Sequence, residues 1–179
     1  GMPDGAYNTM LARVQAEDNP NFFLLAYQRS DYRVQQLVLV PKHFVTVSMI
    51  APRRNALKGR DNYLMCDLDI RELPESGKIP LVTAGKAIDP AHIQKQWQTH
   101  LFLRQQKAEK KGWLLAILHC LDQLPAQFTL AQLYAFSDKL QKQFPDNHHI
   151  QAKIRQQLQI LRDQNLIEFS ARGQYRKMA

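Results

Sequence analysis

An apolar stripe near the C-terminus constrains the fold of this chain more than any other feature. Its members recur at intervals of four, four and three residues, and they are Ile150, Ile154, Leu158 and Leu161. This spacing places the four side chains on one side of an α-helix over 150–163, for which Asp146 or Asn147 is the expected N-cap. One side of the helix must therefore pack against an apolar core, while the other side is polar and faces outward.

The segments around this helix predict a small domain over 113–179. They comprise a densely apolar helix, a second helix and two strands around a glycine turn, at 113–121, 130–144, 166–169 and 174–177. Thr129 is the expected cap of the second helix, and Gly173 lies in the turn of the hairpin. Three helices followed by a hairpin is the order of a winged helix-turn-helix, whose third helix enters the major groove of DNA.

The preceding segment, 2–106, predicts a separate α/β domain. Helices are expected at 6–16 and 90–105, and strands are expected at 22–27, 34–40, 63–70 and 79–82. Asp4 is a candidate cap for the first helix, and the first two strands are nearly continuous in apolar residues, as in strands covered on both faces. Residues 107–112 are charged, end in glycine and form the expected linker between the two domains.

The polar side of the third helix predicts contacts with DNA bases. The candidate residues on this helix and just before it are Asn147, His148, His149, Gln151, Ala152, Lys153, Arg155, Gln156 and Gln159. Glutamine and asparagine pair with the edge of adenine, arginine pairs with that of guanine, and alanine fits a thymine methyl group. Two alternatives remain: a solvated face used for protein contacts, and an Arg155 that pairs with Asp163 or another acidic residue and only stabilises the fold.

The hairpin adds positive charge beside this helix. Arg172, Gly173, Arg176 and Lys177 form a basic wing of the kind that grips phosphates or enters the minor groove, although an ordinary basic hairpin would look the same. The whole chain carries a formal net charge of +8, which fits a polyanionic partner such as nucleic acid.

The sequence predicts no catalytic residue, metal site or cofactor. His148 and His149 are adjacent, so on a helix they would point about 100° apart and could not bind one metal ion. Metal-dependent nucleases need an Asp and a Glu-x-Lys on neighbouring strands. Asp4 has no such partner at a suitable distance, and Asp67 and Asp69 share a strand face without the required lysine. P-loop, GxGxxG and Ser-His-Asp signatures are also absent from the sequence.

Cysteine usage and hydropathy bear on the expected compartment. Cys66 and Cys120 lie far apart in apolar stretches, which predicts buried free thiols and a reducing environment. No apolar run approaches the roughly 18 to 20 residues that span a bilayer, and no signal peptide is recognisable. We therefore expect a cytoplasmic location and no membrane partner.

Motifs along nearly the whole chain resemble one family. In the predicted winged helix they are Phe128-Thr-Leu, Leu133-Tyr-Ala-Phe136, Asn147-His-His-Ile, residues 153–163, Leu166-Ile-Glu-Phe169 and residues 172–177. Before it, in order, they are Asp4-Gly-Ala-Tyr7, residues 13–16 and 19–23, Leu39-Val-Pro-Lys42, Phe44-Val-Thr46 and Leu101-Phe-Leu-Arg104. These segments resemble the Dam-replacing type II restriction endonucleases, which are methyl-directed enzymes that cut GATC when its adenine is methylated.

The resemblance implies a fold and an incomplete site. The family carries a PD-(D/E)xK nuclease domain with a zinc ribbon, followed by a winged helix, and its catalytic motif and cysteine pairs precede the counterpart of Asp4. By position, Arg155 resembles the family's guanine-reading arginine, and Tyr63 stands where the family can carry Trp near a methyl-adenine pocket. No residue here matches the catalytic Asp, Glu and Lys. Because Gly1 reads as a tag remnant and Met2 as a native start, we expect a truncated or split gene.

Together these patterns predict an α+β protein, with a partial nuclease-like domain over 2–106 and a winged helix over 113–179. The expected function is binding of double-stranded DNA, with methylated GATC as the site implied by the resemblance and Mg²⁺ needed only by the complete family enzyme. Two alternatives stay open. One is an active metal-dependent endonuclease completed by a separate chain that carries the catalytic motif, and the other is a protein-interaction module. A second copy of the chain, in a homodimer, is a further candidate partner.

Overall fold

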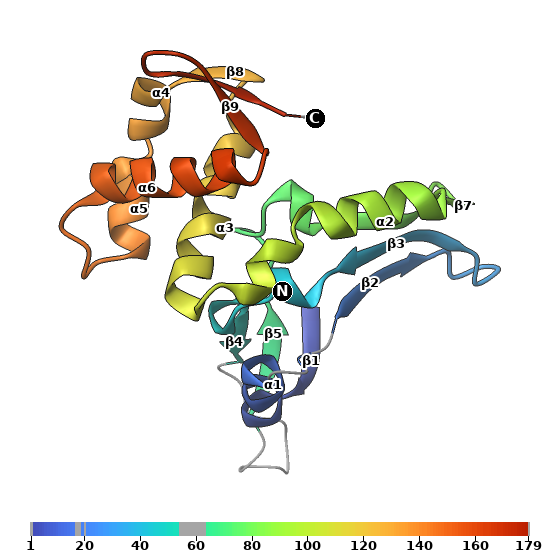
Figure 1. Ribbon diagram of the computed structural model, residues 1–179. Coiled ribbons are helices and arrows are strands. Elements are labelled where there is room, and N and C mark those ends of the chain that lie inside the picture. The colour runs from blue at the N-terminus through green and yellow to red at the C-terminus, as the bar shows by residue number, and fades with distance from the viewer. Residues whose placement is uncertain (1, 17–18, 20, 54–63, 179) are drawn as a thin grey trace. The chain divides into compact units, whose positions relative to one another are not determined.

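A computed structural model describes residues 2–16, 19, 21–53 and 64–178, which fall into two compact units that divide after Ala108 (Figure 1). The first unit contains β1 (Met2–Ala6), α1 (Tyr7–Gln15), β2 (Phe22–Tyr27), β3 (Val34–Val40), η1 (Lys42–Phe44), η2 (Val47–Met49), β4 (Ile50–Pro52), β5 (Met65–Leu68), η3 (Glu75–Gly77), β6 (Ile79–Thr83), β7 (Lys86–Ala87), α2 (Pro90–Thr99) and η4 (Leu101–Gln105). The second contains α3 (Ala108–Asp122), β8 (Gln127–Thr129), α4 (Leu130–Tyr134), α5 (Ser137–Gln143), α6 (Ile150–Asp163), β9 (Ile167–Ala171) and β10 (Gln174–Lys177). This mixture of helices and strands confirms the predicted α+β class.

The first unit has two antiparallel sheets, with strand orders β2-β3-β6-β7 and β1-β5-β4. The strands predicted at 22–27, 34–40 and 79–82 are confirmed, and β5 is shorter than the predicted 63–70 within the described residues. The prediction that Asp4 caps the first helix is wrong, because Asp4 lies in β1 and α1 begins after Ala6. Residues 2–6 pair with β5 instead, a long-range interaction that local sequence does not reveal.

The expectation that β2 is covered on both faces is also wrong. β2 is an edge strand, and its alternate side chains Phe23, Leu25 and Tyr27 are 58%, 56% and 50% exposed. Phe23 and Leu25 stand opposite Leu39 and Leu37 of β3. A continuous apolar run does not show which face of a strand a neighbouring element covers, and here one row of β2 is left open among the described residues.

Aromatic rings of η1, α2 and η4 form a cluster in the core of the first unit. The ring of His43 lies 5.1 Å from those of Phe44 and Trp97, and the ring of His100 lies 5.3 Å from that of Phe44. Asp89 caps α2 by accepting a hydrogen bond from the Ala91 amide at 3.1 Å. The single helix predicted over 90–105 is interrupted at His100, where the backbone leaves the α-helical region and η4 begins. This break lets His100 turn into the aromatic cluster, where it is 8% exposed.

We expect Gly77→Ala to lower the free energy of unfolding of the first unit by about 1–3 kcal/mol, the usual cost of overfilling a packed core. A Cβ at Gly77 would lie 2.7 Å from Cδ1 of Phe44 and 2.8 Å from Cδ1 of Leu73, and both side chains are buried. Denaturant unfolding followed by fluorescence measures the loss. Gly112→Ala is the matched control, because its nearest neighbour would be Cε1 of Phe144 at 3.9 Å. Equal stability of Gly77→Ala and the wild type would contradict this packing.

We expect the stability of the first unit to fall on acidification because burial lowers the pKa of His100. A backbone hydrogen bond with Gln96 acts in the opposite direction but is the weaker influence. The unfolded state takes up a proton near the ordinary pKa of about 6.5, whereas the folded state resists it until lower pH. The stability present above about pH 6.5 is therefore lost as the pH falls, by at most about 1.4 kcal/mol per pH unit for one proton.

Unfolding titrations between neutral and mildly acidic pH test this expectation. His100→Gln should flatten the pH dependence, and the control His92→Gln should leave it unchanged, since His92 is exposed on α2. An identical acid-side slope in His100→Gln and the wild type would refute the assignment.

The second unit has the helix and strand order expected of a winged helix. Its third helix, α6, has the predicted bounds, and Ile150, Ile154, Leu158 and Leu161 are all buried. The predicted hairpin is β9 and β10, and Gly173 in its turn has a φ of 71°, in the left-handed region that favours glycine. The sequence did not predict β8, which completes a sheet of order β8-β10-β9.

Three local predictions in this unit need correction. The linker expected at 107–112 is helical from Ala108, because α3 starts there. The helix expected over 130–144 is divided into α4 and α5, and at the break the Ser137 hydroxyl donates to the Tyr134 carbonyl at 2.6 Å. The residue that caps α6 is His149, with no side-chain capping bond, while the Asn147 side chain accepts from the His149 amide at 2.9 Å. The predicted cap at Thr129 is confirmed as a reciprocal capping box with Gln132.

Within the described residues, none of the helices has both the length and the apolar character needed to cross a membrane.

Candidate nucleic-acid interface

The outward side of α6 carries most of the side chains predicted to meet DNA bases. Exposed residues on this side include Gln151, Ala152, Arg155, Gln156 and Gln159, and the helix ends with the exposed ion pair of Arg162 and Asp163. Amide and guanidinium groups are of the type that reads adenine and guanine in the major groove. The amphipathic pattern of α6 thus presents these groups together on one helical surface.

Lys153 lies differently from the other predicted contacts. Its side chain is 22% exposed, and its ammonium lies 3.8 Å from a carboxylate oxygen of Glu109 and 5.9 Å from the ring centroid of Trp113. Glu109 and Trp113 both belong to α3. Lys153 therefore stabilises the packing of α6 against α3, and its charge is not directed outward like that of Arg155.

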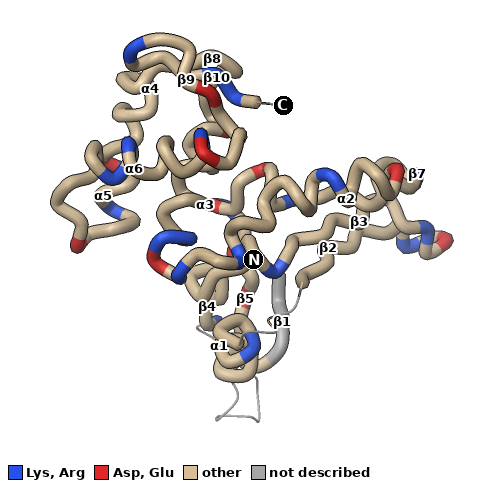
Figure 2. The backbone as a smooth tube through the Cα atoms, viewed as in Figure 1, with Lys and Arg blue, Asp and Glu red and all other residues tan. Residues whose placement is uncertain are grey.

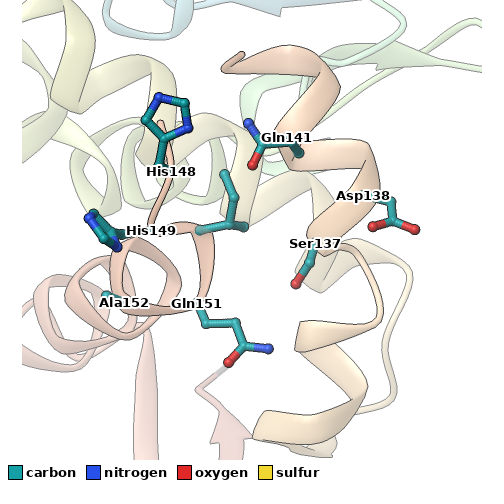
Figure 3. A pocket seen from close by; sticks show the side chains of 8 residues that line it. Ser137, Asp138, Gln141, His148, His149, Gln151 and Ala152 are labelled. Atoms are coloured by element: carbon teal, nitrogen blue, oxygen red, sulfur yellow. The ribbon is translucent and has the colours of Figure 1, made fainter. Parts of the chain in front are cut away.

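Residues just before α6 line a shallow groove of about 410 Å³. Figure 3 shows the segment from His148 to Ala152 on one side of this groove and Ser137, Asp138 and Gln141 of α5 on the other. The lining is mainly polar and includes the carboxylate-bearing Asp138, which lies on the α5 side, across the groove from His148 and His149. The two histidines place polar ring edges at the start of α6.

Arg155 is held by a tyrosine and makes no ion pair with Asp163. Its Nη1 donates a hydrogen bond to the Tyr134 hydroxyl at 2.6 Å, whereas Asp163 accepts from Nη2 of Arg162 at 3.0 Å. Tyr134 is the last residue of α4. The alternative in which Arg155 pairs with Asp163 is therefore not what the structure shows.

Among the described residues, the basic side chains of the wing differ in whether the protein itself engages them. Arg176 of β10 pairs with Glu168, the residue opposite it on β9, and Lys177 donates to the Leu124 carbonyl at 2.6 Å. Arg172 is exposed at the tip of the β9–β10 hairpin, which is marked as basic in Figure 2, and it has no hydrogen-bond or ion-pair partner among the described residues. The tip next to Gly173 is open, since nothing lies within 4 Å of a Cβ built there.

Two neighbouring aspartates of the first unit, Asp67 and Asp69, pair with arginine side chains. Asp67 accepts from Nε of Arg53 at 2.8 Å, and Asp69 accepts from the backbone and side chain of Arg71. The side-chain hydrogen bonds of Arg71, helped by its backbone amide, lower the pKa of Asp69 to about 2. Among the described residues, no three His, Cys, Asp or Glu side chains come together as a metal site.

Two other predictions concern the first unit and the cysteines. Tyr63, predicted from the resemblance to lie near a methyl-adenine pocket, falls outside the described residues. Cys66 and Cys120 are both buried thiols that are not joined in a disulfide, as predicted.

Comparison with known proteins agrees with this arrangement of helices and wing. Residues 109–177 match the Dam-replacing HTH domain, and residues 1–106 match the Dam-replacing family. The chain belongs to the Dam-replacing family. The HTH match spans α3 to β10, so α6 and the wing of this Dam-replacing chain are parts of a DNA-binding domain. The place of Tyr134 in this site is not predictable from the sequence, because nothing in its local pattern pairs it with an arginine 21 residues later.

We expect Arg172→Ala to weaken binding to all duplexes alike and to lower the slope of log affinity against log salt by about one unit. The reason is that Arg172 is exposed at the wing tip, where we expect its charge to contact the DNA backbone. Arg176→Ala is the matched control and should change the slope less, since Glu168 already neutralises that charge. Fluorescence anisotropy over a salt series measures both slopes. A larger change for Arg176→Ala than for Arg172→Ala would contradict this picture of the wing.

Proposed function

We propose that this chain recognises GATC with a methylated adenine in double-stranded DNA, and that it does so without cutting it. The observation that carries the proposal is the outward side of α6, where the exposed Arg155 stands among Gln151, Gln156 and Gln159. The exposed Asp163 at the end of this helix pairs with Arg162. Arginine is suited to guanine and glutamine to adenine, the two purines of GATC. A wing with a free Arg172 supplies the backbone contact that sets the register of such a helix.

A competition experiment tests this specificity. Labelled duplex with methylated GATC is bound to the full chain and displaced by unlabelled methylated, unmethylated or scrambled duplex at a fixed salt concentration. The proposal expects the methylated site to compete best and the scrambled duplex to compete worst. Equal competition by all three duplexes would leave DNA binding in place and overturn the proposed specificity.

The absence of cutting is a separate part of the proposal. It is supported by the ion pairs of Asp67 in β5 and Asp69 just after it, because each carboxylate is engaged by an arginine. Incubation of the purified chain with methylated GATC plasmid and Mg²⁺ should leave the plasmid intact. Stoichiometric cleavage at GATC by contaminant-free protein would overturn this part.

A second candidate function is association with another protein chain through β2. The edge position of β2 and the exposed row of Phe23, Leu25 and Tyr27 favour it, since an uncharged edge strand with apolar side chains is open to pairing with a further strand. The partner would be a second copy or a separate chain that carries the catalytic motif. Sedimentation of the chain alone and with candidate partner chains tests this. Leu25→Lys places a charge in the exposed row of β2. If the wild type, like this variant, is a monomer that binds none of the candidate partner chains, association through β2 is contradicted.

A further inference from the structure

A hydrogen bond joins the outward arginine of α6 to the end of α4. Nη1 of Arg155 donates to the hydroxyl of Tyr134 at 2.6 Å, and both helices belong to the second unit, where α4 contacts α6 (Figure 1). A free arginine side chain samples many rotamers and loses this freedom when it binds a base. A partner on the protein that fixes the guanidinium beforehand reduces this loss.

We infer that Tyr134 is a positioning residue that holds the Arg155 guanidinium ready for guanine, an inference that rests on the proposed function of α6. Tyr134 acts through Arg155 and is not itself assigned a contact with a base. A guanidinium has five N–H donors, and a bidentate contact with guanine O6 and N7 uses two of them. The bond to Tyr134 uses one donor on Nη1, and the edge formed by Nε and Nη2 has no partner among the described residues.

Tyr134 is itself well fixed. The hydroxyl of Ser137 donates to its carbonyl at 2.6 Å, and the capping box at Thr129 holds the start of α4. The amide of Leu130, the first residue of α4, donates to the carbonyl of Gly173 in the wing turn at 2.9 Å. These bonds attach α4 to the wing at one end, while Tyr134 holds Arg155 at the other.

Tyr175 lies close enough to Tyr134 and Arg155 for both to influence its pKa. Burial is the main cause that raises the pKa of Tyr175, and the nearby Tyr134 raises it further, while the charges of Arg162 and Arg155 act to lower it. Its ring packs on that of Phe128, with centroids 5.4 Å apart. Tyr175 makes no hydrogen bond through its hydroxyl among the described residues, which makes it a matched control for the hydroxyl of Tyr134.

The test compares Tyr134→Phe with Tyr175→Phe in the full chain. Affinities are measured by anisotropy for a methylated GATC duplex and a scrambled duplex, together with the melting temperature. Tyr134→Phe should lower the GATC-to-scrambled affinity ratio roughly two- to tenfold, the range expected for one hydrogen bond, with the melting temperature close to that of the wild type. Tyr175→Phe should keep the wild-type ratio. Adding Tyr134→Phe to Arg155→Ala should cause no further loss of ratio, because the two residues act through one contact.

Each outcome separates the inference from the function on which it rests. If the wild type binds both duplexes equally, the proposed function fails, and the inference fails with it. If the wild type discriminates and Tyr134→Phe keeps the full ratio, only the inference is overturned. A Tyr134→Phe variant that loses both affinities equally and melts earlier would also overturn it, because Tyr134 would then serve only the stability of the fold.

Discussion

Replacement of Arg155 by alanine is expected to reduce the discrimination between GATC and scrambled duplexes by about ten- to a hundredfold. A bidentate arginine–guanine pair is worth about 1–3 kcal/mol of discrimination, and about 1.4 kcal/mol corresponds to a factor of ten. Arg155 is exposed on α6 and engages the protein through the Tyr134 hydroxyl alone among the described residues, so its loss leaves the core of the second unit intact. Binding to scrambled DNA should weaken much less, because that binding depends on contacts with phosphates.

Equilibrium binding to both duplexes, with the melting temperature of each variant, measures this effect. Gln159→Ala is a suitable control on the same exposed side of α6, and its loss of discrimination should be smaller because an amide carries no charge. If Arg155→Ala weakens both duplexes equally and also lowers the melting temperature, Arg155 supports the fold and does not read a base.

The largest expected loss of stability is that of Ile154→Ala, which should cost the second unit about 2–5 kcal/mol. Ile154 lies at the centre of the apolar stripe of α6 and is fully buried. Removing its side chain leaves a cavity that close-packed neighbours fill only in part. Because α6 carries the candidate DNA contacts, binding should be lost at temperatures where this unit unfolds.

Thermal and denaturant unfolding of the variant tests the packing directly. Ile160→Ala removes the same atoms from a half-buried position on the same helix and should cost less. Equal losses for Ile154→Ala and Ile160→Ala would contradict the burial of the stripe, whereas DNA binding restored by cooling would support a purely structural role for Ile154.

The elements that the sequence predicts well are those coded by local periodicity. The spacing of Ile150, Ile154, Leu158 and Leu161 is sufficient for the bounds of α6, and Gly173 marks the turn of the hairpin. Gln157 shows the limit of this reasoning. It lies three residues after Ile154 and is fully buried, but its polar type gives no reason to place it among the core residues.

The features that the sequence misses depend on residues far apart in the chain. Strands β1 and β8 form only because distant segments pair with them, and a three-residue strand such as β8 has no recognisable period. Side-chain partners follow the same rule. Arg176 is expected from its charge to reach DNA but faces Glu168 across the hairpin, and Lys153 is expected to face outward but lies near Glu109. The charge of a lysine or arginine alone does not show whether it pairs with a carboxylate within the protein.

The sequence predicts which side chains of the candidate site are exposed, but it does not predict which of them contact one another. Helical geometry alone predicts that Gln151, Arg155 and Gln159 face outward, and all three are exposed. The hydrogen bond between Arg155 and Tyr134 joins α6 to the last residue of α4, just before the break between α4 and α5. That break depends on tertiary packing, since the sequence over 130–144 favours a continuous helix.

The central claim, that α6 reads guanine in the major groove through Arg155, is tested most directly by altering the base. Substitution of 7-deazaguanine for the guanines of a methylated GATC duplex removes the N7 acceptor and leaves pairing with cytosine unchanged. The wild-type chain is expected to bind this duplex about tenfold more weakly than the methylated GATC duplex with ordinary guanine, and Arg155→Ala is expected to bind the two duplexes equally. Equal binding of both duplexes by the wild-type chain would contradict the claim.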